Sequence, residues 1–544
     1  MKRILLFIAI SLLSISCSLD EHIEGFADRA TAYDTRDQAE AVVNKCYTYL
    51  NNFITTNFGL MNEACTDLWY CDTGTVDAYL NISPSNPGHG TSVWNNCYAG
   101  VMCCNEAIAC IEASEKISQK DKQSLLVEAK ALRALYYYYL TNTFDGVPFY
   151  TYMVADRETQ DKIQKLPRTH ADEIRKALYE DLKFSVENYC TAESGLIVRP
   201  SENRGNRTGY ALSLMLMAKF AMWVAQHGDS DYWNNALYAL EKLEDLYGKD
   251  LNKYPLEETS WNIKNTPESI FELQHAWSTT GVQYSSSYGR LLLPPYKNGK
   301  FDGVSMPELG ENLANWAELR ATKHFIAPSD KATETSIFSN PPLSKSPIDG
   351  LLHIDKQIIE EIESFDHRME YVIGLGKIST GATFSNVASG KYCYAGPKFW
   401  CMDMVSSYDS NNYKLFRYAD AVLMMAECYA RKFPNDFVKA TEYLNKTRER
   451  AGLDKLADFT SEDTFMAELY DERARELAGE LHRKYDLVRW GVWYEWLAPD
   501  GAYKYNTYSK LQQNIRPCHE YYPIPDTECS LSDYILTNDA YKAE

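Results

Sequence analysis

Apolar residues recur every three or four positions along most of this 544-residue chain. That spacing places them on one face of an α-helix and leaves the polar positions on the other face. The pattern predicts a mostly α-helical protein with paired helices, as in tetratricopeptide repeats, where stacked pairs bury a continuous core. The predicted helices span residues 34–55, 92–115, 118–144, 171–189, 207–225, 232–247, 413–431 and 435–452.

The strongest helical pattern lies near the C-terminus, over residues 471–491. Leu477, Leu481, Tyr485 and Val488 follow one another at spacings of four, four and three, and the segment contains no proline. Such an apolar face implies packing against other helices rather than the wall of a cleft. We therefore expect this segment to be structural.

The predicted helix has signals at both of its ends, with the start upstream of residue 471, and the segment carries many charges. Thr460 followed by Asp463 resembles a capping box, and Gly491 suits the end of a helix. Most of the charged residues can form ordinary surface pairs, which stabilise little when exposed. A further set can pair or stack inside a polar network: Arg473, Arg483, Arg489 and the neighbouring Trp490.

The helical period weakens in two stretches. Residues 57–90 are rich in Gly, Pro, Asn and Asp and predict a long ordered loop, which is uncommon unless it is functional. Residues 249–411 also lack a sustained period. Within them, residues 268–273 predict a short strand and residues 281–303 predict a loop. The expected fold is a helical scaffold with a large irregular, loop-rich inserted region.

The N-terminus has the features of a targeting segment. Two basic residues precede an apolar run over residues 4–15, which is shorter than the ~20 apolar residues of a membrane span. Cys17 ends this run as in a bacterial lipobox, although Ser14 stands where leucine is preferred. We expect a lipoprotein signal peptide over residues 1–16 and acyl chains on Cys17. An ordinary signal peptide with an incidental cysteine is the alternative.

These patterns divide the remaining chain into three parts. Residues 17–33 form an acidic tether. Residues 34–248 and 412–491 form the helical core, and residues 249–411 and 492–544 form the irregular, loop-rich part. No other run is long and apolar enough for a membrane span, so we expect contact with the membrane through the lipid anchor only.

Charge and cysteine content narrow the function. The formal net charge is −20 at pH 7, and nucleic-acid binding depends on Lys and Arg that neutralise phosphates, so we expect no nucleic-acid partner. The 14 cysteines include no CxxC pair, which argues against zinc, and we expect no metal and no other cofactor. Buried free thiols are expected, with a bridge between Cys518 and Cys529 left open.

The charged segment over residues 471–491 resembles the C-terminal signature of the SusD/RagB family of nutrient-uptake lipoproteins. Leu481 departs from it, because the family usually has glycine there, and we interpret this as added volume at one helical position. The matching residues are Glu472, Arg473, Glu476, Leu477, Glu480, His482, Arg483, Asp486, Leu487, Arg489, Trp490 and Gly491.

Other segments resemble the family in the same order along the chain. Residues 128–148 match a helix and the turn after it, although Asp145 and Gly146 stand in inverted order. Residues 417–427 and 444–452 match further helical motifs, and residues 521–525 match the closing YPIP motif. The resemblance thus covers essentially the whole mature chain.

This resemblance implies a function. It indicates an outer-membrane lipoprotein that faces the cell exterior, binds a nutrient and delivers it to a SusC-like TonB-dependent transporter. An oligo- or polysaccharide is the expected ligand, and a peptide or another nutrient is the alternative.

The sequence offers no catalytic motif. It lacks GxSxG, HExxH and a GxGxxG between a strand and a helix. A glycoside hydrolase needs two carboxyl groups at a set separation in space, and none of the 75 acidic residues can be chosen for that role from sequence. We expect a protein that is not an enzyme. A glycoside hydrolase and a scaffold that binds only protein are the less favoured alternatives.

Aromatic residues are the candidates for ligand contact. Tyrosine is twice as frequent as phenylalanine, 40 against 20. Its ring can stack on a sugar while polar neighbours bind the hydroxyls. Most rings in a helical protein pack in the core, and Trp69 and Tyr70, the leading candidates, have that alternative of pinning their loop to the core. The candidates in polar, Gly-rich stretches and their neighbours are Asp67, Trp69, Tyr70, Tyr79, Asn81, Trp277, Tyr284, Tyr288, Tyr296 and Trp316.

Overall fold

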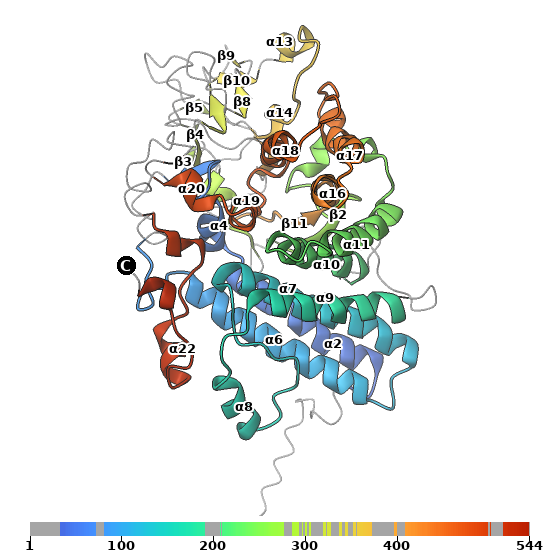
Figure 1. Cartoon of the computed structure of the whole chain (residues 1–544), viewed down its shortest axis with the longest axis vertical. Helices are drawn as coiled ribbons and strands as arrows, with labels where there is room; N and C mark the ends of the chain where they lie inside the picture. The colour runs from blue at the N-terminus through green and yellow to red at the C-terminus, as the bar shows by residue number, and fades with distance from the viewer. Residues whose placement is uncertain are drawn as a thin grey trace, which may run out of the picture.

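A computed structural model of the chain describes most of the helical part and shorter pieces of the rest (Figure 1). The signal peptide, Cys17 and nearly all of the tether lie outside the described residues. The structure describes residues 33–71, 81–190, 207, 209–276, 285–292, 296–297, 300–301, 304–305, 319–322, 324–327, 337–339, 343–345, 352–354, 356–372, 397–399, 408–498, 501 and 515–542.

Helices dominate this part of the chain, which confirms the predicted fold class. The longer helices are α2 (Arg36–Cys46), α3 (Thr48–Phe53), α4 (Thr56–Glu63), α6 (Gly90–Ala113), α7 (Gln119–Phe144), α8 (Arg157–Gln164), α9 (Ala171–Asn188), α10 (Tyr210–Gln226), α11 (Tyr232–Tyr247), α16 (Tyr418–Arg431), α17 (Phe437–Arg450), α18 (Glu462–Leu477), α19 (Arg483–Arg489), α20 (Trp493–Leu497) and α22 (Asp526–Leu531).

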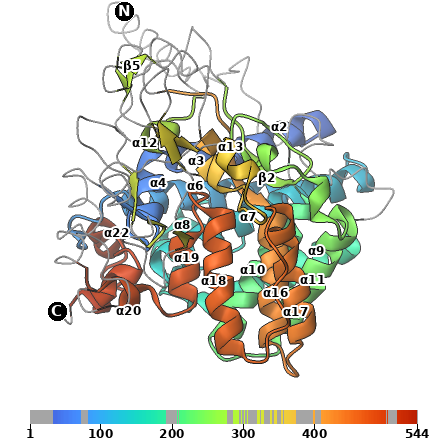
Figure 2. The same cartoon turned by 90° about the horizontal axis from the view of Figure 1, so that it is seen from above.

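The helices stack in layers. In Figure 1, α2, α6, α7 and α9 lie on one side, α10 and α11 lie across the middle, and α16, α17 and α18 lie beyond them. Helix α7 contacts α6 and α9, α10 contacts α9 and α11, and α16 contacts α11, α17 and α18. Figure 2 shows α16, α17, α18 and α19 along one face of the molecule. Each helix therefore buries its apolar face against the next layer.

Short strands make up much of the rest. They are β1 (Trp69–Cys71), β2 (Ser269–Leu273), β3 (Tyr296–Lys297), β4 (Lys300–Phe301), β5 (Val304–Ser305), β6 (Leu319–Ala321), β7 (Ile326–Ala327), β8 (Phe338–Ser339), β9 (Leu343–Lys345), β10 (Leu352–Ile354) and β11 (Tyr413–Arg417). Antiparallel pairs join β1 to β6, β2 to β11 and β9 to β10, a meander joins β3, β4 and β5, and β7 runs parallel to β8. The short helices α12 (Gly289–Leu292), α13 (Lys356–Glu360) and α14 (Met369–Val372) lie among them along the chain.

Three local predictions were wrong. Residues 57–90 are not one loop, because α4 and β1 lie within or across them, and residues 281–303 contain α12, β3 and β4. The helix predicted from residue 413 begins at Tyr418, after strand β11. The predictions missed α4 and β11 for the same reason. Nearly all residues of both elements are buried, which removes the apolar–polar alternation on which the prediction depends. The strand predicted over residues 268–273 is confirmed as β2. The boundaries of the predicted domains stay predictions.

The signature segment is broken, which corrects the single helix predicted there. Helix α18 is capped by Ser461 rather than Thr460, ends at Leu477, and is followed by a turn before α19. Leu481 lies in that turn with φ of 67°, a left-handed conformation that favours glycine. The family glycine is therefore a requirement of the backbone, and leucine there costs about 1–2 kcal/mol in conformational energy. Burial of the Leu481 side chain offsets part of that cost.

A buried carboxyl group holds this turn. The backbone N–H of Leu481 donates to Glu63 Oε1 at 2.6 Å, and Glu63 is fully buried at the end of α4. Burial raises the pKa of Glu63 to about 8, although the Leu481 N–H and the charges of Lys398 and Arg483 oppose the rise. Glu63 is therefore mostly protonated at neutral pH in the folded protein.

The charged face of the signature is buried in a network of ion pairs. Arg417, at the end of β11, donates to Glu480 at 2.8 Å and to Glu268 at 2.9 Å, and its Nη1 lies 2.6 Å from Glu476 Oε1. Lys398 Nζ donates to the same Glu480 at 2.5 Å. The network therefore joins the turn after α18 to the β2–β11 pair and to the segment that contains Lys398.

The network continues along α18 to two more segments. Arg450, at the end of α17, pairs with Glu476. Arg368 Nη1 lies 2.6 Å from Glu472 Oε1, and Arg368 also donates twice to Asp366 at 2.8 Å. These side chains are almost completely buried. Because a buried charge without a partner is very unfavourable, each pair fixes the position of the segment that supplies it.

A smaller cluster connects α16 to α19. Arg489 donates from both terminal nitrogens to the two oxygens of Glu427 at 2.7 Å, and Trp490 Nε1 donates to Glu427 Oε1 at 3.1 Å. Burial alone would raise the pKa of Glu427, but the attraction of Arg489 dominates and lowers it to about 2. The predicted pairing of Arg489 and Trp490 inside a polar network agrees with this geometry.

Replacing Arg489 with methionine tests this cluster. The change leaves Glu427 charged and buried, so we expect the free energy of unfolding to fall by about 3–5 kcal/mol. Adding Glu427→Gln should recover part of the loss, because no unpaired charge then remains. Urea unfolding followed by tryptophan fluorescence measures both effects.

The control for this prediction is an exposed pair. Lys162 and Glu158 lie 2.8 Å apart with side chains 67% and 78% exposed. Lys162→Met should change stability by less than about 1 kcal/mol. An equally small loss in the Arg489→Met variant would contradict the role given to the buried pair.

Glu63→Gln tests the protonated carboxyl. The folded pKa of about 8 lies above the ordinary value of 4.5, so the Glu63 contribution is fully present below pH 4.5 and is lost as pH rises through 8. The stability of the variant relative to the native protein should therefore increase between pH 5 and pH 8, by at most about 1.4 kcal/mol per pH unit. Glutamine keeps the acceptor for the Leu481 N–H. Urea unfolding across this range, with the exposed Glu495→Gln as control, measures the difference, and parallel pH profiles would refute the assignment.

Candidate functional site

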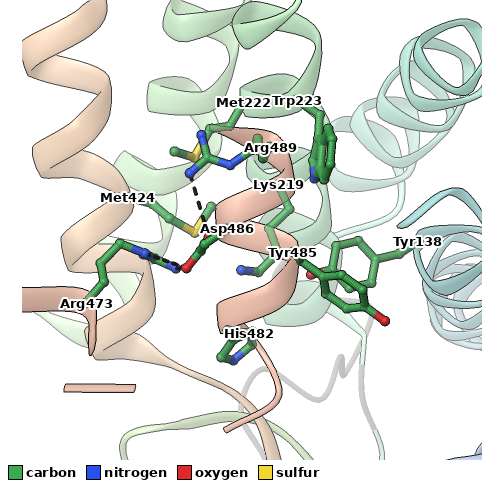
Figure 3. Close-up of a pocket in the computed structure, with 10 residues that line it drawn as sticks. All are labelled: Tyr138, Lys219, Met222, Trp223, Met424, Arg473, His482, Tyr485, Asp486 and Arg489. Carbon is green, nitrogen blue, oxygen red and sulfur yellow. Dashed lines mark hydrogen bonds and ion pairs between the residues drawn. The ribbon is translucent and has the colours of Figure 1, made fainter. Parts of the chain in front are cut away.

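The charges of the signature surround a small internal cavity, shown in Figure 3. Its volume is about 20 Å³, enough for one water molecule but not for a sugar ring. Arg473 donates to Asp486 at 2.8 Å, and Lys219 Nζ donates to Asp420 at 2.7 Å beside it. The cavity is therefore part of the protein interior rather than a ligand site.

The electrostatics of this cluster do not suit acid–base catalysis. Burial opposes the charge of Asp420, but Lys219 and Arg473 dominate and hold the pKa of Asp420 well below its usual range. Burial lowers the pKa of His482 to about 4, so the ring is neutral near pH 7. A general acid or base works best with a pKa near the working pH. Asp420 and His482 titrate far from it, and their arrangement is structural.

The two leading sequence candidates lie in the core. Trp69 and Tyr70 are in β1, which pairs with β6, and Trp69 is completely buried with its ring 5.2 Å from that of Phe325. Asp67 is also buried, and both its oxygens accept hydrogen bonds from Arg483 at 2.8 and 2.6 Å. The structure thus supports the alternative in which these residues pin the segment to the core.

The other predicted contacts are dispersed or undescribed. Tyr288 is buried, and its hydroxyl donates to the carbonyl of Gly479 at 3.1 Å. Asn81 is exposed, and Tyr296 lies in β3. The remaining four lie outside the described residues: Tyr79, Trp277, Tyr284 and Trp316.

A cleft that sequence reasoning missed lies between α6, α8 and α22. We call it the aromatic cleft. Its volume is about 250 Å³, and Trp94, Tyr98 and Tyr150 line one wall. Trp94 and Tyr150 are only 4% and 5% exposed, and the Tyr98 hydroxyl donates to the Pro148 carbonyl at 2.8 Å. The rings of Trp94 and Tyr150 therefore present little open surface to the cleft, whereas stacking on a sugar needs an open face.

A larger hollow lies beside it, between the end of α7 and the C-terminal segment. We call it the C-terminal hollow. Its volume is about 500 Å³, and Asp145, Arg168, Glu520, Tyr521 and Tyr541 line it. All five side chains are partly exposed. The sequence analysis named none of these residues as ligand contacts, and the inverted Asp145–Gly146 order is the sequence feature that marks this corner as unusual.

Metal and thiol chemistry have no visible centre in the part of the chain that the structure describes. No group of three or more His, Cys, Asp or Glu residues in these ranges is arranged to hold a metal ion. No disulfide joins two cysteines within the same ranges, so the bridge left open between Cys518 and Cys529 is not formed. Most of these thiols are buried, as expected.

Family models match both ends of the chain. The model described as "SusD family" matches residues 384–541, and the model described as "Starch-binding associating with outer membrane" matches residues 29–198. Within the described ranges, no helix has the length and apolar character that crossing a membrane requires.

Individual proteins match over nearly the whole length. SusD-like protein P25 from Formosa agariphila is 25% identical, with 97% of both chains covered. The crystal structure of a SusD homolog from Bacteroides thetaiotaomicron matches with a TM-score of 0.69 at 17% identity, over 93% of this chain and 97% of that one. Surface glycan-binding protein A from the same organism, in complex with laminarihexaose, matches with a TM-score of 0.64 at 20% identity, over 92% and 99% of the two chains.

The sequence motifs, the two family models and the shared fold agree with one another from the first described helices to the C-terminal segment. They also agree with the expectation that the protein is not an enzyme. The family models at the two ends of the chain, the relatives along nearly its whole length and the shared fold thus make this chain similar to the proteins of the SusD/RagB family.

Proposed function

We propose that this protein is a glycan-binding lipoprotein of the outer membrane that faces the cell exterior and delivers its ligand to a SusC-like TonB-dependent transporter. The observation that carries the proposal is the starch-binding, outer-membrane-associated family model that matches residues 29–198. The surface glycan-binding protein bound to laminarihexaose, which shares the fold, supports a carbohydrate as the ligand class.

Without Asp67, Trp69, Tyr70 and Tyr288, which are buried, six of the ligand contacts proposed from sequence remain. Asn81 is exposed, and Tyr79, Trp277, Tyr284, Tyr296 and Trp316 remain candidates for stacking on sugar rings. An uptake protein must release its cargo, so a shallow site of modest affinity suits this role. Aromatic faces with amide and carboxylate neighbours meet that requirement, because they bind sugars through many weak contacts.

Anchoring of the protein to the membrane and transfer of the ligand to the transporter depend on different parts of the system. Acyl chains on Cys17 would hold the folded body at the membrane surface, and stable anchoring takes more than one chain. The transfer step rests on the family resemblance, which implies a transporter as the partner that receives the cargo. A permanent complex with such a transporter would bury a large area, about 2,000 Å² or more.

Glycan binding is tested by calorimetry on the mature protein with neutral oligosaccharides, including laminarihexaose and maltoheptaose. Trp277→Ala and Trp316→Ala should each weaken binding by roughly tenfold, because an aromatic contact contributes about 0.5–1.5 kcal/mol beyond its buried area. The matched control is Phe433→Ala, which removes a ring that is 87% exposed on the turn between α16 and α17. No binding of any glycan by the intact protein would refute the proposal and favour a peptide or another nutrient.

Anchoring is tested by replacing Cys17 with alanine. The variant should move from the membrane fraction to the soluble fraction, and mass spectrometry of the native N-terminus should find an acylated Cys17. Mild-detergent purification of the anchored protein should recover a TonB-dependent transporter. An unmodified N-terminus elsewhere, or purification without a transporter, would contradict the corresponding part of the proposal.

A further inference from the structure

The C-terminal hollow has walls that are held firmly in place. The backbone N–H of Tyr522 donates to the Thr143 carbonyl at 2.7 Å, which ties the C-terminal segment to α7. Arg168 donates to the carbonyls of Phe144, Gly146 and Thr537 at 2.6, 2.7 and 3.1 Å. The hollow therefore exists before any ligand arrives, as binding sites usually do.

One residue of the wall is strained. Asp145 ends α7 with φ of 61° and ψ of −123°, a conformation that normally requires glycine. The family pattern has glycine at this position, so the strain is specific to the order Asp145–Gly146. Gly146 cannot exchange places with it, because a Cβ there would lie 2.8 Å from the Thr169 carbonyl oxygen.

Among the residues that the structure describes, the Asp145 side chain has no partner that accounts for the strain. Its carboxylate makes no hydrogen bond or ion pair with any residue that the structure describes, although its charge attracts Arg168. The N–H groups of Arg168 are directed to backbone carbonyls. Backbone strain of this kind is concentrated at binding and catalytic sites, and Asp145 lines the hollow.

Glu520 completes a pair of available acceptors. It lines the same hollow, is partly exposed and has no side-chain hydrogen bond or ion pair within the described ranges. Burial raises the pKa of Glu520, and the charge of Lys484 opposes the rise. Tyr521 and Tyr541 lie in the same wall, and the Tyr541 hydroxyl donates to the Tyr521 carbonyl at 2.7 Å, which fixes the position of the Tyr541 ring.

The two carboxylates and the two tyrosines of the hollow favour one class of ligand. Tyrosine rings that are partly exposed can pack on the C–H faces of a sugar, and free carboxylates accept hydrogen bonds from its hydroxyls. Two carboxylates repel an anionic ligand, and the guanidinium of Arg168 is already committed to carbonyl oxygens. A neutral oligosaccharide fits these groups better than a charged one.

We propose that the C-terminal hollow is a subsite for a neutral oligosaccharide, with Asp145 and Glu520 as hydroxyl acceptors and Tyr521 and Tyr541 as ring contacts. The proposal rests on the proposed glycan-binding function and adds a place and a ligand class to it. It also explains why a strained aspartate occupies a corner that suits glycine.

Asp145→Gly separates binding from stability. Glycine relieves the strained backbone and removes the carboxylate, so the melting temperature should rise while affinity falls by roughly tenfold. Asp145→Asn keeps the strain and loses the charge, so it should weaken binding with little change in melting temperature. Glu520→Gln and Tyr541→Ala should also weaken binding. Calorimetry of the full mature protein with laminarihexaose, maltoheptaose and a panel of other neutral oligosaccharides measures affinity.

The control is Asp526→Asn, which removes an exposed acidic residue that does not line the hollow and should leave affinity unchanged. Unchanged affinity in the Asp145, Glu520 and Tyr541 variants, with binding retained by the native protein, would overturn the subsite and leave the proposed function intact. Lower stability of Asp145→Gly would show that the aspartate is structural and would also overturn it. Absence of binding to the whole panel by the native protein would refute the proposed function itself.

Discussion

The pairing of buried charges is the constraint on which the C-terminal half of this structure depends. Removing an ion from water costs several kcal/mol, and only a close partner with good geometry offsets that loss. Glu472, Glu476 and Glu480 lie along the end of α18 and the turn after it, and they meet arginines from α17, β11 and the segment near residue 368. Each of these elements must therefore be in place for the others to be stable, which couples the helical layers to the β2–β11 pair.

The sequence predicts the helices well and their interruption poorly. Apolar spacing identifies α6, α7, α9, α10, α11 and α17 within a few residues, because the helical period is sustained along each of them. The same spacing continues from Leu477 through Leu481 to Tyr485, although the chain turns between them. Hydrophobic periodicity reports which side chains are buried and not the sign of φ. The glycine in the family pattern was the available signal, and its reason became visible only in the backbone.

The candidate ligand contacts could not be placed from the sequence, because local patterns do not reveal long-range pairing. Loop-like composition around Trp69 correctly marks a segment without an amphipathic helix, but it cannot reveal that β1 pairs with β6, about 250 residues later in the chain. Burial of Trp69 is a consequence of that pairing. The C-terminal hollow is likewise formed by residues near 145 and near 520, which no local pattern brings together. Only the inverted Asp145–Gly146 order indicated that this corner was unusual.

Leu481 and Asp145, two residues with strained backbones, differ in what stabilises them. The interior is fixed by paired charges and by a protonated Glu63, so the turn at Leu481 is held by a hydrogen bond and by side-chain burial. At Asp145 neither compensation is present among the described residues, and the strained residue faces a hollow instead of the core. A strained backbone persists only when its surroundings fix it, and the three carbonyl contacts of Arg168 supply that support. The same contacts would keep the acceptors of the hollow in one arrangement, which reduces the entropy that is lost when a flexible sugar chain binds.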